Sequence, residues 1–127
     1  MNNKEYTKLY NLILNSINDF HLSDSNSFFN LVENNKIDVS TFNNKFIYED
    51  IINIFENLII DKMIKGEKID FIDGPFFRIS GLTTKAYNYL ATISQPKALV
   101  KIKQALHDEG IPITPTSISR FAGKLFF

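Results

Sequence analysis

Apolar side chains recur at helical spacing along the first half of the chain. This spacing predicts an amphipathic helix over residues 4–19, a short helix over residues 26–35 and a long helix over residues 46–63. The apolar arc of the third helix is wide, which is typical of a helix that packs on two sides. In the first helix the apolar face comprises Tyr6, Leu9, Tyr10, Ile13, Ile17 and Phe20. In the third helix it comprises Ile47, Ile51, Ile52, Ile54, Phe55, Leu58, Ile59 and Met63.

After Gly66 the spacing of apolar positions changes to every second residue. Residues 68–72 alternate between polar and apolar side chains, residues 73–75 are a turn signal, and residues 76–80 form a second short alternating segment. We therefore expect a β-hairpin here. Residues 36–46, which precede the third helix, are ambiguous, and their apolar side chains suit a short extended segment.

Helical spacing returns after the hairpin. Thr83 is a suitable N-cap for a fourth helix, and Pro96 suits the first position of a fifth helix that ends before Gly110. Thr116 or Ser117 begins a last short helix. The side chains expected to face inward are Ala86, Tyr87, Leu90, Ile93, Leu99, Ile102, Leu106, Ile118, Phe121, Ala122 and Leu125.

The order of the predicted elements indicates the fold class. Three helices, a β-hairpin and further helices follow the order of a winged helix. We predict an α+β fold: a winged helix-turn-helix, that is, three helices plus a β-hairpin wing, with additional C-terminal helices. The length of 127 residues fits a single domain. Residues 94–127 are expected to form a C-terminal helical appendage to it.

Two stretches that flank the hairpin resemble known sequences. They are residues 58–64, Leu-Ile-Ile-Asp-Lys-Met-Ile, and residues 79–90, Ile-Ser-Gly-Leu-Thr-Thr-Lys-Ala-Tyr-Asn-Tyr-Leu. They are similar to small bacterial winged-helix proteins of the YjcQ-like type and to related uncharacterised prophage-associated proteins. The sequence departs from these families at Ala86, where they usually have glycine. The resemblance implies a winged-helix fold with further C-terminal helices and an origin on a mobile element.

Composition narrows the classes of protein. The chain has no cysteine, which excludes disulfides, thiolate zinc sites and cysteine nucleophiles. We see no secretory signal and no apolar run long enough to cross a bilayer, so we expect a cytoplasmic protein with no membrane contact. The net charge is zero, but residues 1–50 have four lysines and seven acids, net −3, whereas residues 96–127 have five basic residues and two acids, net +3.

No catalytic chemistry emerges from the motifs. The two histidines, His21 and His107, are far apart, and neither has the spaced ligands that a metal site needs. There is no glycine-rich phosphate loop and no Gly-x-Ser-x-Gly nucleophile elbow. We therefore expect no enzyme activity, no cofactor and no metal.

The first functional hypothesis is a DNA-binding regulator or accessory protein, as is usual for this fold. The third helix would enter the major groove and the wing would contact the backbone of double-stranded DNA. Asparagines of the helix would bond adenine edges, and nearby cations would contact phosphates. The residues involved are Asn53, Asn57, Lys62, Lys65, Lys68 and Arg78. Four carboxylates expected on the same helix face oppose this hypothesis, because they would repel phosphates: Glu49, Asp50, Glu56 and Asp61.

The alternative is a protein-interaction module that keeps the fold without binding DNA. Glu49 and Glu56 belong to the acidic helix face that would dock on a partner protein. Ile60 lies among polar neighbours, so it is either a contact residue or covered by residues 36–46 or the C-terminal helices. Phe126 and Phe127 either pack on the core or form the seam of a homodimer through the C-terminal helices.

Overall fold

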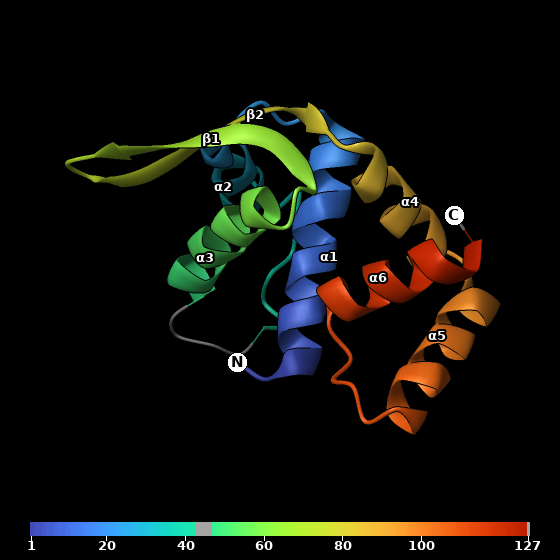
Figure 1. The fold of residues 1–127 in the computed structure, drawn as a ribbon. Coiled ribbons are helices and arrows are strands. Elements are labelled where there is room, and N and C mark those ends of the chain that lie inside the picture. The colour runs from blue at the N-terminus through green and yellow to red at the C-terminus, as the bar shows by residue number, and fades with distance from the viewer. Residues whose placement is uncertain (43–46, 127) are drawn as a thin grey trace.

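The computed structural model describes the backbone of residues 1–42 and 47–126 and their side chains as far as residue 124. Six helices and one antiparallel hairpin make up the described chain. They are α1 (Asn3–Phe20), α2 (Ser25–Glu33), α3 (Ile47–Ile60), β1 (Ile64–Phe71), β2 (Gly74–Leu82), α4 (Thr84–Ile93), α5 (Pro96–Asp108) and α6 (Pro115–Phe126). Helix α1 runs through the middle, with α2, α3 and the hairpin on one side and α4, α5 and α6 on the other (Figure 1).

The predicted α+β character and the helices are confirmed within a few residues at each end. The side chains of Asn2, Asp24 and Thr83 each accept a backbone hydrogen bond from the first turn of a helix, and Thr83 is the N-cap that the sequence predicted. Pro96 occupies the first turn of α5, and Gly110 follows that helix with φ 70°. The start of the third helix at Phe46 lies outside the described residues.

The hairpin is longer than the alternation predicted. Its strands pair from Ile64 with Leu82 to Phe71 with Gly74, and the register shifts between Lys65 and Gly66. That bulge breaks the polar–apolar alternation, so the inner part of the hairpin was invisible to a period-two pattern. A Cβ added to Gly66 would lie 2.2 Å from the carbonyl oxygen of Arg78, so the close approach of the two strands requires glycine there.

The turn between α1 and α2 holds the inner part of β2. Arg78 forms an isolated antiparallel bridge with Asp24. The amide of Ile79 donates to the Ser23 carbonyl over 2.8 Å, and the amide of Phe77 donates to Ser25 Oγ over 3.1 Å. Beyond this anchored region the hairpin extends away from the helices (Figure 1).

A single hydrophobic cluster joins the two sides of the molecule. Phe55 stacks on Phe77 and meets Phe28 edge-on, with ring centroids 5.8 Å apart in both pairs. On the other side of α1, Tyr10 meets Tyr89 edge-on at 6.2 Å. Buried side chains of α5 and α6 belong to the same cluster, namely Ile102, Leu106, Ile118 and Ala122. The C-terminal helices therefore pack on the helical core.

Two expectations about burial were wrong. Phe20 is 47% exposed because α1 ends there and His21 turns the chain with φ 52°. Tyr87 is 54% exposed, and Tyr89 is buried in its place, because the buried face of α4 passes through residues 86, 89 and 90. Of the ambiguous segment 36–46, residues 43–46 lie outside the described part of the chain, and residues 36–42 form no strand. Ile37 and Phe42 are buried as parts of an irregular segment.

Candidate functional site

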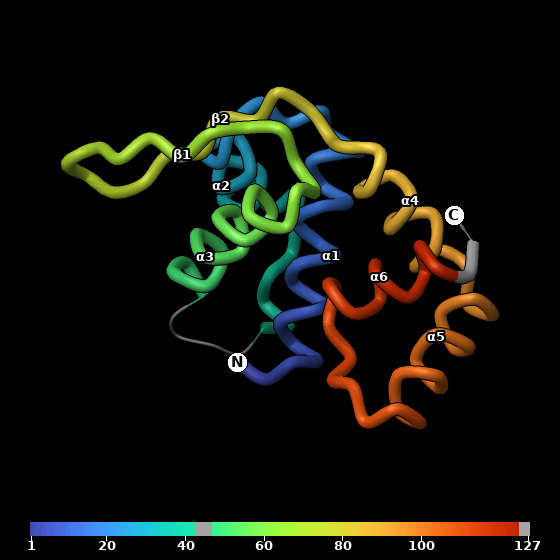
Figure 2. The backbone as a smooth tube through the Cα atoms, in the orientation of Figure 1, coloured from blue at the N-terminus to red at the C-terminus, as the bar shows by residue number. Residues whose placement is uncertain are grey.

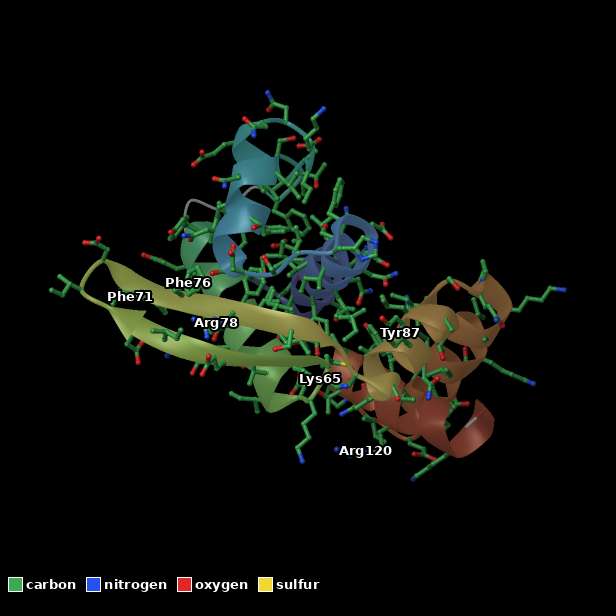
Figure 3. All side chains as sticks on the ribbon, turned by 90° about the horizontal axis from the view of Figure 1, so that it is seen from above. Lys65, Phe71, Phe76, Arg78, Tyr87 and Arg120 are labelled. Carbon is green, nitrogen blue, oxygen red and sulfur yellow. The ribbon has the colours of Figure 1, made fainter. Side chains whose placement is uncertain are left out.

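The free end of the hairpin carries an apolar surface. Phe71 and Ile72 are 59% and 106% exposed. Phe71 contacts Phe76 with ring centroids 6.0 Å apart, and Ile69 pairs with Phe76 across the hairpin. Because side chains alternate between the faces of a strand, these rings lie opposite the face on which Phe77 enters the core. Figure 3 shows Phe71 near the free end of the hairpin and Phe76 nearer to the helices. We name the set Ile69, Phe71, Ile72 and Phe76 the hairpin tip.

The charges beside the hairpin tip are mainly negative. Asp70 and Asp73 are both exposed next to it. The nearest predicted cation, Lys68, lies 3.4 Å from Glu56 of α3 and 3.9 Å from Asp70. The carboxylates of Glu56 and Asp70 thus flank the ammonium group of Lys68. The hairpin tip combines apolar surface with acidic flanks.

The exposed face of α3 has a similar character. Glu49, Asn53, Glu56 and Ile60 follow one another at intervals of three or four residues, so they form one stripe along the helix. Ile60 is 66% exposed. No described residue of the preceding loop or of the C-terminal helices therefore buries Ile60, and its role as a contact residue stays a prediction. No lysine, arginine or histidine occurs in α3.

Two polar residues expected on that face turn inward instead. Asn57 Nδ2 donates to Tyr6 Oη over 2.8 Å, and Tyr10 Oη donates to Asp61 Oδ2 over 2.9 Å. Burial, and next the negative charge of Asp61, raise the pKa of Tyr10 well above its ordinary value. The amide of Asn57 is therefore engaged between α1 and α3, whereas the adenine contact proposed for it needs a side chain directed outward.

The other predicted cations differ in their surroundings. Arg78 is paired with Glu67 across the hairpin, with 3.0 Å between Nη1 and Oε1. Lys62 and Lys65 are exposed, and neither forms an ion pair with any residue in the described ranges. Lys65 lies at the base of the hairpin, on the side toward α4 and α6 (Figure 3).

The structure does not test the contact role predicted for Phe126 and Phe127 at the C-terminus. Helix α6 ends at Phe126. Phe127 and the side chain of Phe126 lie outside the described part of the chain. The homodimer seam therefore stays a prediction, which the sedimentation coefficient of the purified chain would test.

Two features of the surface were not predicted from the sequence. The first is the hairpin tip, whose signal was available: Phe71 and Ile72 directly precede a turn, where polar side chains are usual. The second is a cleft of about 870 Å³ between α1 and the chain that follows α5. No sequence pattern predicts this cleft, because the residues of its two walls are about a hundred positions apart in the chain.

The described residues contain no group of three or more metal-ligating side chains. None of the helices in the described ranges is long and apolar enough to cross a membrane. No protein-family model matches the chain, and no curated protein or solved structure matches it either.

Proposed function

We propose that this chain is a winged-helix domain that uses its third helix and its wing to bind a protein. The order of the elements supports the fold assignment, because α1, α2 and α3 precede a hairpin that projects from the helices. The sequence resemblance around the hairpin supports the same assignment. In this interpretation α3 is the helix that would enter DNA in related folds, and the hairpin is the wing.

The observation that carries the proposal is the chemistry of these two elements. A surface that binds DNA gains most of its affinity from cations on phosphates. Here α3 has three carboxylates and no cation. Lys68 and Arg78 are already paired with carboxylates. The hairpin tip is apolar instead, and burying Phe71 and Ile72 against a partner would contribute about 1.5–3 kcal/mol each.

The same surface defines the chemistry of the partner. Asp70 and Asp73 flank the tip, and Glu49 lies on the exposed stripe of α3. The complementary surface is an apolar pocket with a basic rim, since opposite charges at the rim speed encounter and select the partner. A protein with such a pocket is the proposed ligand.

Double-stranded DNA is the second candidate. It is favoured by Lys62 and Lys65, which are exposed at the base of the hairpin, and by Asn53, which is exposed on α3. These residues would give few phosphate contacts, and binding would weaken steeply with salt. A labelled duplex in fluorescence anisotropy separates the two candidates, with Lys65→Gln as the variant that reduces the salt dependence.

The direct test removes the apolar tip. We compare quantitative affinity capture from the native host for the wild type, the double variant Phe71→Ser, Ile72→Ser, and the control Val100→Ser. Val100 is 67% exposed on α5, so the control removes a similar side chain from a different surface. We expect the double variant to lose a partner that the wild type and Val100→Ser both retain.

Three results would overturn the proposal. The tip variant and the control could retain the same proteins to the same extent. The wild type could capture nothing above an unrelated protein of equal charge. Alternatively, the duplex could bind at low salt and be released as salt rises, which would favour the second candidate instead.

A further inference from the structure

The cleft between α1 and the chain that follows α5 has no hairpin residue in its lining. Its walls are the N-terminal half of α1, the end of α5 and the link that follows, which passes beside α1 before α6 begins (Figure 2). Its volume of about 870 Å³ falls within the range of small-molecule sites, roughly 300–1,000 Å³.

The lining is apolar on one side and basic on the other. Ile111, Pro112 and Ile113 supply an apolar wall from the link. Lys4 and Lys8 are one helical turn apart on α1, and Lys103 faces the cleft from α5. No described residue that lines the cleft carries a carboxylate. The cleft thus has three lysines in its lining and no carboxylate among its lining residues to pair with them. The Nζ of Lys8 lies over the ring of Phe42, 5.7 Å from its centroid.

Two polar groups of α1 in the cleft have unused hydrogen-bonding capacity. Thr7 Oγ1 is buried and has no partner among the described residues. A buried hydroxyl without a partner is unfavourable, and such groups are rare. Asn11 Oδ1 accepts a hydrogen bond from Tyr89 Oη, which orients its amide, and Nδ2 forms no hydrogen bond within the described part. Thr7 and Asn11 are four residues apart, so both donors lie on one face of α1.

From this juxtaposition we propose that the cleft binds a small organic carboxylate with an apolar body. The carboxylate lies among the lysines and accepts a hydrogen bond from Asn11 Nδ2, and from Thr7 Oγ1 once that hydroxyl, enclosed in the unliganded structure, turns toward the cleft. The apolar body lies against Ile111 and Ile113. The extent of apolar wall distinguishes this ligand from an inorganic anion, and the absence of a glycine-rich loop distinguishes it from a nucleotide. The proposal is independent of the partner proposed for the hairpin.

The test uses anilinonaphthalene sulfonate, a fluorescent anion with an apolar body, and displaces it with decanoate. N-phenylnaphthylamine, which lacks the sulfonate, serves as the neutral probe. The variant pair Lys8→Gln, Lys103→Gln removes two cations from the cleft. The control pair Lys97→Gln, Lys101→Gln removes two from the same molecule, and both control residues are exposed on α5 outside the cleft.

We expect the cleft pair to bind the anionic probe and decanoate about tenfold more weakly than the wild type, as two partly exposed ion pairs allow. The control pair should change the affinity less than twofold, and the neutral probe should bind all three proteins equally. In the wild type, decanoate should shift the backbone amide signals of Gly110, Ile111 and Ile113 in nitrogen–proton correlation spectra.

Other outcomes would refute the proposal. Equal weakening in the two pairs would mean that the anion senses only the overall charge. Decanoate that shifts signals of the hairpin and not those of the link would assign the binding elsewhere. A wild type that binds neither anion at millimolar concentration would exclude the site. Urea unfolding of both pairs checks that the variants are equally folded.

Discussion

Tyr10 donates a hydrogen bond to Asp61 over 2.9 Å, and this contact ties the middle of α1 to the turn after α3. Tyr10 is fully buried. The backbone carbonyl of Asp61 also accepts a hydrogen bond from Lys85 Nζ at the start of α4, over 2.9 Å. One residue therefore connects three helices, on the side of α3 that an amphipathic pattern assigns to solvent.

Removal of the Tyr10 hydroxyl should destabilise the fold. Tyr10→Phe keeps the ring and deletes the donor to a carboxylate, so we expect the free energy of unfolding to fall by about 1.5–3 kcal/mol. Tyr48→Phe is the control, because Tyr48 is 61% exposed, and its effect should stay below about 0.5 kcal/mol. Urea unfolding measures both values, and equal effects would show that the Tyr10 bond contributes nothing specific.

Alkaline pH should unfold the protein through its buried tyrosines. Burial raises the pKa of Tyr10 and of Tyr89. The folded state thus keeps protons that the unfolded chain loses near pH 10, the ordinary value. Stability from this source is complete below pH 10 and falls above it, by about 1.4 kcal/mol per pH unit for each tyrosine.

Denaturant midpoints measured from neutral to strongly alkaline pH check this prediction. In Tyr89→Phe one of the tyrosines with a raised pKa is gone, so the decline above pH 10 should become less steep. A slope that is unchanged in Tyr89→Phe would mean that this tyrosine ionises in the folded state.

The two glycines Gly66 and Gly123 should respond in opposite ways to alanine. Gly66→Ala forces a Cβ against the Arg78 carbonyl, and we expect a loss of about 2 kcal/mol from this overpacking. Gly123 lies in α6 with nothing within 4 Å of its added Cβ, so Gly123→Ala should stabilise the protein by about 0.5–1 kcal/mol. Thermal unfolding of both variants provides the comparison; a neutral Gly66→Ala would contradict the tight strand contact.

Thr7→Val should stabilise the unliganded protein by about 1 kcal/mol, because it removes a buried hydroxyl that has no partner in the described structure. It should also weaken anion binding to the cleft. Thr92→Val is the matched control: the hydroxyl of Thr92 donates to the Asn88 carbonyl over 2.8 Å, so its loss should not stabilise the fold. Melting temperatures with and without decanoate separate the two effects.

Periodicity predicted the elements well because each helix buries a local stripe of its own sequence. It failed where the outcome depends on residues distant in the chain. Asn57 and Asp61 have the spacing of a solvated face, yet the hydroxyls of Tyr6 and Tyr10 bond them from α1, fifty-one residues away. A polar residue with a partner on another helix cannot be told from a solvated one by its spacing.

In the candidate sites, too, local spacing predicted some features, whereas others depend on residues distant in the chain. Ile60 was singled out from sequence as an apolar residue among polar ones, and it is exposed. The cations were assigned from their positions near the predicted helix and wing, and the pairing of Lys68 with Glu56 and of Arg78 with Glu67 depends on the hairpin register. That register includes a bulge at Gly66, which a period-two pattern does not contain.

The hairpin is bonded to the helices at its inner part and extends freely at its turn, which has a consequence for engineering. Within the described chain, the bonds that hold it to the helices involve Lys68, Phe77 and Ile79, all inward of the turn. Residues 71–74 form a turn with no role in the core, and exposed turns of this kind tolerate insertion. Foreign peptide sequences grafted between Phe71 and Gly74 should be displayed at the end of a two-stranded arm, so the domain is a natural scaffold for exchangeable recognition loops.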